Sequence, residues 1–264
     1  MKNLKMELSR GLRTGTFKVS LLIGCLICLL NRYNFEKNIK SYGKYVISYK
    51  GWIGFEYTLP YSQIFFCVLP ILAALPYAGS YYQDMHSGYM KNVCAKSSRK
   101  AYYLSKLSAV FMISSATIII PMLLDLYVCA GLYPTRKPEL LLADVPVVPE
   151  KALLSSVYSY SPVLYCIVFT LLDGIFAGLF GIFSVMISEM VESLFACLCL
   201  PFLIYLIEGM ATADEKHIRW SFNYILTPSH GGYLSVKNLF SFLGVSAAVI
   251  VVWLVIRIKK KDVL

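Results

Sequence analysis

Six blocks of apolar residues, each long enough to cross a bilayer, constrain this sequence more than any other feature. About 20 consecutive apolar residues span the hydrocarbon core of a membrane as a helix. We place the spans at about residues 15–31, 61–82, 101–131, 161–187, 193–211 and 239–256. The first block is short and begins beside Lys18, whose charged end must reach back to the membrane surface. The sequence therefore predicts an all-α, polytopic membrane protein with six transmembrane helices.

The composition of the 264-residue chain agrees with this fold class, since 58% of its residues are hydrophobic and 15% are charged. A water-soluble domain of this length needs more charge to cover its surface. The net charge of +10 does not indicate nucleic acid, because the cations flank apolar blocks and no RNA-binding module is recognisable. We expect one transmembrane domain over residues 1–264 and no nucleic-acid partner.

Segments outside the blocks complete the predicted architecture. Residues 1–14 form an amphipathic pattern typical of a helix on the membrane surface, with apolar side chains among cations at Leu4, Met6, Leu8 and Leu12. Pro70 and Pro76 predict a kink in the second span. Only residues 188–192 separate the fourth and fifth spans, which are therefore antiparallel neighbours.

The distribution of lysine and arginine predicts the orientation. An even number of spans puts both termini on one side of the membrane. Lys and Arg are denser in the short segments on that side, and residues 257–261 add a final basic cluster. Cytoplasmic segments carry such an excess of Lys and Arg. We expect a multi-pass protein of the cell membrane with both termini in the cytoplasm.

Three carboxylates lie within or beside the apolar blocks, namely Asp125, Asp173 and Glu208. A charge in the hydrocarbon is costly unless it is paired, hydrated or protonated. One interpretation is that these residues line a transport path or a gate. The other is a carboxylate near the outer membrane boundary that is bonded to a neighbouring helix. The second is favoured for Asp125 and Glu208, and both fit Asp173, which lies nearer the middle of its span.

The fourth span also carries three closely spaced glycines, at Gly174, Gly178 and Gly181. Small residues at such spacings let two helices approach closely. We expect a helix-packing face here, and a mobile interface is the alternative interpretation.

Motifs of known enzymes are absent from the sequence, which has no His-Glu-x-x-His, no Gly-x-Ser-x-Gly and no Walker A loop. A membrane-embedded enzyme using Asp125 and Asp173 is an alternative, although Asp173 lacks the preceding Gly-x-Gly of such proteases. The eight cysteines lie mostly in apolar blocks and show no metal-site spacing. We expect no catalysis by the chain itself, no bound cofactor and no metal.

The polar segment at residues 83–100, between the second and third spans, is the most informative part of the sequence. An apolar stripe within it is typical of a short helix lying across the membrane surface, and its members are Met85, Tyr89, Met90 and Val93. Gly88 allows close approach of a partner backbone. The simplest alternative is a positively charged loop that only fixes topology.

This segment resembles the corresponding region of the ABC-2 family of ABC transporter permeases. In that family an acidic residue, a Ser-Gly pair, a short helix, a Ser-Arg pair and a lysine entering the next span follow the second helix. The matching positions here are Asp84, Ser87, Gly88, Ser98, Arg99 and Lys106. The motif-level match covers this segment, and the six spans and the surface helix extend it coarsely over the chain.

The resemblance implies that the short helix couples the permease to a separate cytoplasmic ATPase through Asp84, Ser87, Gly88, Tyr89, Arg99 and Lys106. It implies two permease copies around a path, with ATP and Mg²⁺ bound in the partner subunit. The implied function is export of a hydrophobic or amphipathic cargo, such as a peptide, drug or lipid conjugate, with peptide export or self-immunity as the expected role. An ATPase-independent membrane scaffold or immunity protein is a further alternative.

Overall fold

A computed structural model describes residues 2–38, 47–55, 60–135, 148, 152–191, 193–214, 217–228 and 236–259. Helices make up 84% of this part of the chain, and it contains no strand. Six helical segments in it are long and apolar enough to cross a membrane. The predicted all-α class with six spans is therefore confirmed, and the chain is a multi-pass membrane protein.

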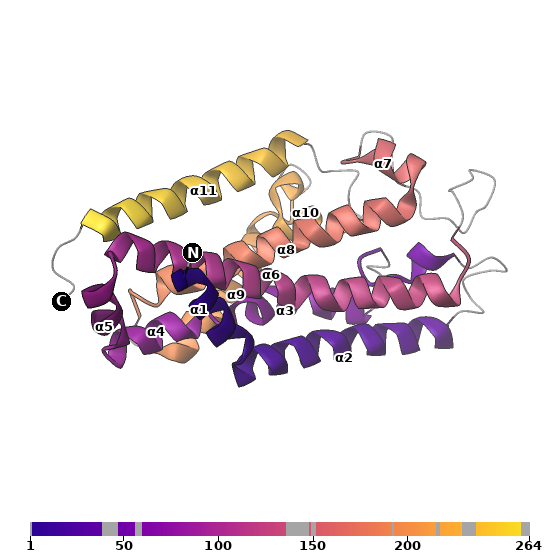
Figure 1. Ribbon diagram of the computed structural model, residues 1–264. Coiled ribbons are helices and arrows are strands. Elements are labelled where there is room, and N and C mark those ends of the chain that lie inside the picture. The colour runs from indigo at the N-terminus through magenta and orange to yellow at the C-terminus, as the bar shows by residue number, and fades with distance from the viewer. Residues whose placement is uncertain are drawn as a thin grey trace.

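The six candidate spans follow one another along the chain (Figure 1). They are α2 (Gly15–Lys37), α3 (Pro60–Ala74) continued by α4 (Gly79–His86), α6 (Arg99–Leu132), α8 (Pro162–Ile187), α9 (Leu194–Ala211) and α11 (Val236–Lys259). Short helices lie between and beside them: α1 (Lys2–Leu12), η2 (Ser48–Gly51), α5 (Tyr89–Lys96), α7 (Ser155–Tyr160), η3 (Ile218–Trp220) and α10 (Phe222–Leu226).

Hydroxyl side chains begin four of the long helices. The side chains of Thr14, Ser98, Ser161 and Ser193 each accept a backbone N–H from the first turn of the helix that follows. Such caps satisfy an otherwise unpaired donor. The capped starts lie close to the boundaries expected from the apolar blocks.

The end of α2 differs from the expectation, because the helix continues past residue 31 to Lys37. It does so because Arg32 is buried against Asp125 and does not need to leave the bundle.

Close contact between α6 and α8 forms the centre of the bundle. A Cβ atom added at Gly174 would lie 2.4 Å from the Ile119 side chain, and one at Gly178 would lie 2.4 Å from Phe111. A Cβ atom at Gly181 would lie 2.3 Å from the Ser114 hydroxyl. The three glycines of the fourth span thus all lie against α6, where only a missing side chain leaves room for the neighbour.

The second span is broken into two helices at residues 75–78, and the predicted kink is present. Pro76 has no N–H with which to bond the carbonyl of Leu72, and the hydroxyl of Ser20 donates to that oxygen instead at 2.7 Å. The hydroxyl of Ser114 donates to the Ala73 carbonyl at 2.6 Å, and that of Thr16 donates to Pro76 at 2.8 Å. Neighbouring helices therefore satisfy the carbonyls that the break exposes.

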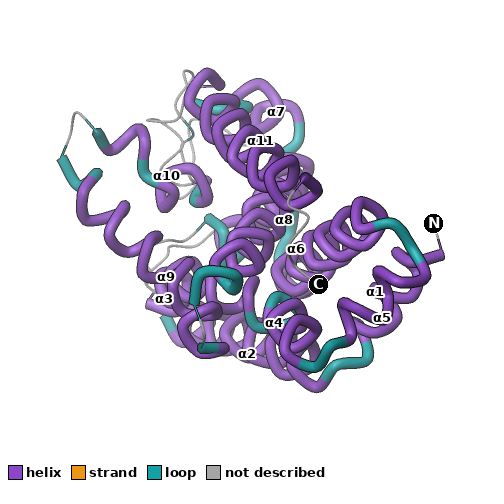
Figure 2. The backbone as a smooth tube through the Cα atoms, turned by 90° about the vertical axis from the view of Figure 1, so that its left-hand side faces the viewer, coloured by secondary structure: helices purple, strands orange, loops and turns teal. Residues whose placement is uncertain are grey.

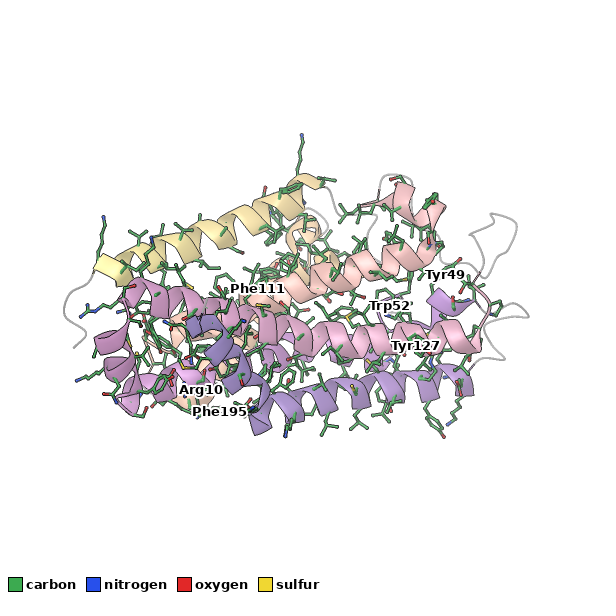
Figure 3. All side chains as sticks on the ribbon, in the orientation of Figure 1. Arg10, Tyr49, Trp52, Phe111, Tyr127 and Phe195 are labelled. Atoms are coloured by element: carbon green, nitrogen blue, oxygen red, sulfur yellow. The ribbon has the colours of Figure 1, made fainter. Side chains whose placement is uncertain are left out.

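The two ends of the bundle carry different elements. In Figure 1, α1, α4, α5 and the C-terminal end of α11 lie at one end, and η2 and α7 lie at the other. Figure 3 likewise places Arg10 of α1 far from Trp52 and Tyr49. Seen along the bundle in Figure 2, α9 and α10 lie on the flank opposite α1 and α5. The polar segment at residues 83–100 and helix α1 thus share one end of the molecule.

Candidate functional site

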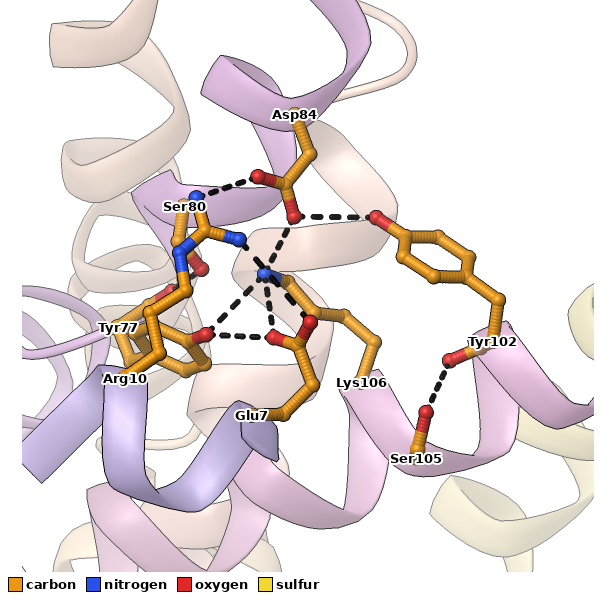
Figure 4. Close-up of polar contacts among 8 residues, drawn as sticks. All are labelled: Glu7, Arg10, Tyr77, Ser80, Asp84, Tyr102, Ser105 and Lys106. Carbon is orange, nitrogen blue, oxygen red and sulfur yellow. Dashed lines mark hydrogen bonds and ion pairs between the residues drawn. The ribbon is translucent and has the colours of Figure 1, made fainter. Parts of the chain in front are cut away.

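A buried charge cluster joins helix α1 to the second and third spans (Figure 4). We use this name for six residues: Glu7 and Arg10 of α1, Tyr77 in the break of the second span, Asp84 of α4, and Tyr102 and Lys106 of α6. The cluster contains two carboxylates and two cations. Its formal charge is balanced, as a group of buried ions requires.

Lys106 is the centre of the charge cluster. Its Nζ atom donates to Asp84 Oδ2 at 2.7 Å and to Glu7 Oε2 at 3.1 Å. The same ammonium lies 4.5 Å from the centre of the Tyr77 ring. Lys106 is 0% exposed, so these contacts replace its hydration entirely. A lysine in this position is held by two carboxylates from two other helices.

The remaining contacts connect the cluster to the polar segment. Arg10 donates to Asp84 Oδ1 at 2.6 Å, and Tyr102 donates to Asp84 Oδ2 at 3.1 Å. Tyr77 donates to Glu7 at 2.5 Å. Burial opposes the charged form of Arg10, but the hydrogen bond and charge of Asp84 outweigh it, and the pKa of Arg10 is raised. Arg10 also lies over the ring of Tyr89, the first residue of α5, at 4.6 Å.

The structure divides the predicted coupling residues into two groups. Asp84 and Lys106 are buried inside the charge cluster, where a partner protein cannot touch them. Ser87 is exposed at the end of α4, and the half-buried Tyr89 opens α5. Gly88 between them has φ 72°, a left-handed conformation that glycine adopts without strain. Arg99, also half-buried, is the first residue of α6.

The predicted short helix in the polar segment is α5. Met90 is buried in a core shared with Tyr102 and Tyr103 of α6, and Met85 and Val93 pack against the same core. Of the apolar stripe expected on one helix, Met90 and Val93 of α5 face the bundle, whereas Met85 belongs to α4, which ends before Gly88. Lys91, Asn92 and Ala95 point away from the bundle and are exposed.

Four members of the charge cluster were missed by sequence reasoning: Glu7, Arg10, Tyr77 and Tyr102. One signal was present. Glu7 follows Leu4 by three positions and precedes Gly11 by four, so it falls on the face of α1 that packs inward. An acidic residue on the buried face of a basic helix calls for an internal cation, and the sequence alone does not say which one.

Asp125 belongs to a second buried group at the other end of the bundle. It accepts the backbone N–H of Ile53 at 2.8 Å and forms an ion pair with Arg32 at 3.5 Å. Arg32 also donates to the Gly51 carbonyl at 2.8 Å and to the thiol of Cys129. The structure thus bonds Asp125 to neighbouring elements and uses it to hold residues 51–53 against α6.

Asp173 has a different environment. It is 0% exposed, and neither of its carboxylate oxygens has a hydrogen-bond partner among the described residues. It is therefore not hydrogen-bonded to Asp125, and the two residues do not form a proton-sharing pair. Glu208 lies in the wall of a cleft between α3, α9 and α10. The three carboxylates of the spans are accordingly brought to three separate places.

No family model, curated protein or solved structure matches this chain. The function is therefore inferred from the geometry above together with the resemblance in residues 83–106.

Proposed function

We propose that this chain is the membrane subunit of an ATP-driven exporter of the ABC-2 type. The observation that carries the proposal is the placement of α5. This short helix lies at one end of the bundle, packs its apolar side inward and exposes Lys91 and Asn92 to a partner. The surface helix α1 lies at the same end, as it does in the family that the sequence resembles.

The charge cluster supplies a rigid connection behind the proposed docking helix. Tyr89 of α5 lies under Arg10, which bonds Asp84 at the end of the second span. Lys106 in turn ties Asp84 to the third span and to Glu7 of α1. Interiors transmit displacement because they are closely packed. A push on α5 would therefore move α1, α4 and the start of α6 together.

The partners and cargo follow from the same proposal. A separate cytoplasmic subunit binds ATP and Mg²⁺, and two copies of this chain face each other around a path. Both termini and α5 lie in the cytoplasm, and the membrane is that of the cell. The cargo is hydrophobic or amphipathic, with a peptide, drug or lipid conjugate as the expected class and peptide export or self-immunity as the expected role.

Co-purification tests this proposal. The chain is expressed with the ATPase encoded in a neighbouring reading frame and is captured through its own affinity tag. We expect the ATPase to be retained, and we expect Lys91→Glu on α5 to release it. Lys37→Glu is the matched control, because Lys37 is also exposed but lies at the C-terminal end of α2, away from α5.

Two results would overturn the proposal. One is a parent chain that retains no ATPase, and the other is equal retention by the Lys91→Glu and Lys37→Glu variants. Reversal of Asp84 is a poor test, because this residue is 0% exposed and its reversal disrupts the charge cluster whether or not an ATPase binds.

A further inference from the structure

A cleft of about 540 Å³ opens between α3, α9 and α10. Its volume lies within the range of sites that hold small organic molecules, roughly 300–1,000 Å³. The walls combine apolar surface with a few polar groups, which include Gln63, Tyr205, Glu208, Ser221 and Asn223. The cleft is remote from the charge cluster and is not explained by docking of an ATPase at α5.

Glu208 is the charged group in the wall of this cleft. Both of its carboxylate oxygens accept the backbone N–H of Phe222, each at 3.3 Å. Within the described residues, no lysine or arginine forms an ion pair with it. The other buried carboxylates with polar contacts differ in this respect, since Asp125 is paired with Arg32 and Asp84 with Lys106. A half-buried carboxylate with which no cation of the described residues pairs leaves a negative charge for a ligand to neutralise.

Aromatic packing behind the cleft holds Phe222 in place, and Phe180, Phe222 and Phe242 line a separate cavity on that side. The Phe222 ring lies 5.0 Å from Phe242 and 5.6 Å from Phe180, between centroids. Tyr205 packs on Phe180 at 6.0 Å and donates to the side-chain oxygen of Asn223 at 3.4 Å. The Phe222 amide is thus directed at Glu208 before any ligand arrives. Of the aromatic residues, Tyr205 and Tyr224 line the cleft itself, and aromatic rings beside a carboxylate favour organic cations.

We propose that this cleft binds an amphipathic organic cation. The ammonium, phosphonium or guanidinium group lies beside Glu208, and the apolar body lies along Leu206, Met210 and Ile218. As a binding site, the cleft is independent of the ATPase. The proposal depends on the proposed function in one respect only. If the chain is an exporter subunit, organic cations are also the class of cargo that it moves.

Direct binding of a matched pair of probes tests the site. Tetraphenylphosphonium and tetraphenylborate have nearly the same shape and opposite charge. The purified full chain is placed in nanodiscs of phosphatidylcholine without an ATPase, and binding is followed by equilibrium dialysis. We expect saturable binding of tetraphenylphosphonium and an affinity for tetraphenylborate that is at least about tenfold weaker.

Variants locate the binding within the molecule. Glu208→Gln should weaken tetraphenylphosphonium binding about tenfold and remove the preference for positive charge. Glu36→Gln, at an exposed position of α2, should leave binding unchanged. Asn223→Asp adds a second carboxylate to the same wall and should strengthen binding, which keeps the test informative if Glu208→Gln fails to fold.

The proposal is overturned if tetraphenylphosphonium does not saturate, if both probes bind alike, or if neither cleft variant changes the affinity. None of these results bears on co-purification with an ATPase. Conversely, if the chain retains no ATPase, the permease proposal fails, but binding of the cation to this cleft can still be measured. Failure of the site and failure of the proposed function are therefore distinguishable.

Discussion

The ammonium of Lys106 lies 2.7 Å from the carboxylate of Asp84, and both residues are completely buried. Together with Glu7 they connect the three helices α1, α4 and α6. A buried ion pair is weak evidence for stability as such, because desolvation offsets much of its attraction. Removal of one partner is costly, however, because the other charge is left behind.

Replacement of Lys106 by methionine should lower the free energy of unfolding by about 3–5 kcal/mol, since Arg10 would then be the only cation among the described residues that pairs with Glu7 and Asp84. Reversible unfolding in mixed detergent micelles measures this change. Lys100→Met is the control, since Lys100 is exposed and lies six residues earlier in α6. It should change the free energy of unfolding by less than about 0.5 kcal/mol. The double variant Lys106→Met/Glu7→Gln should recover part of the lost unfolding free energy. If the effects of the two substitutions simply add, the contact between Lys106 and Glu7 is contradicted.

Gly88 should tolerate asparagine better than alanine. Its φ of 72° strains a residue with a Cβ atom, although nothing lies within 4 Å of the place where that atom would be. Gly88→Ala should therefore cost about 1 kcal/mol through the backbone alone. Asparagine adopts the left-handed conformation more readily, so Gly88→Asn should cost less. The melting temperatures of the two variants are compared, and that of Gly88→Asn should be the higher. A higher melting temperature for Gly88→Ala would indicate that space, and not backbone conformation, limits the residue at this position.

Gly178 should not accept alanine. The added methyl would lie 2.4 Å from the Phe111 ring and 2.8 Å from the Ser115 hydroxyl, which forces α6 and α8 apart. We expect a loss of about 1–3 kcal/mol in unfolding free energy. Gly244→Ala in α11 is the control, because its methyl would meet nothing within 4 Å. Equal effects at the two positions would mean that α6 and α8 are not in close contact.

Glu189 should make stability dependent on pH. It lies in the turn after α8, where burial raises the pKa of its carboxyl above the ordinary 4.5, although bonds from Tyr81, Arg257 and Trp253 act in the opposite direction. The folded chain then holds its proton to a higher pH than the unfolded chain does. The contribution of Glu189 to stability is therefore greatest below about pH 4.5 and falls as the pH rises through the folded pKa.

Unfolding free energies measured from pH 4 upward test this dependence, with Glu189→Gln as the comparison. The variant should lose the part of the pH slope that belongs to this carboxyl. An unchanged slope would assign the dependence to other groups.

Local patterns explain which parts of this molecule were predictable. The apolar blocks, the stripe of α5 and Pro76 all act within a few residues, so the spans, the short helix and the kink followed from the sequence. The pairing of Glu7 with Lys106 joins positions 99 residues apart, and no periodicity encodes it. Asp84 and Lys106 were predicted as residues that couple to an ATPase, and their burial was not predicted, because it depends on α1 lying over them. The burial of Arg32 was not predicted either, because the first span was expected to end at about residue 31, whereas α2 continues to Lys37.

The break in the second span has a mechanical consequence. Hydroxyl groups of Ser20, Thr16 and Ser114 supply the bonds that its own backbone cannot make. A hydroxyl can rotate and find its acceptor again after a small displacement, whereas an amide in a helix cannot. The two halves of the span can therefore bend at residues 75–78 without leaving a bare carbonyl in the membrane. The second span is thus built as two helices, α3 and α4, and the carbonyls at their connection are held by hydroxyl groups of neighbouring helices.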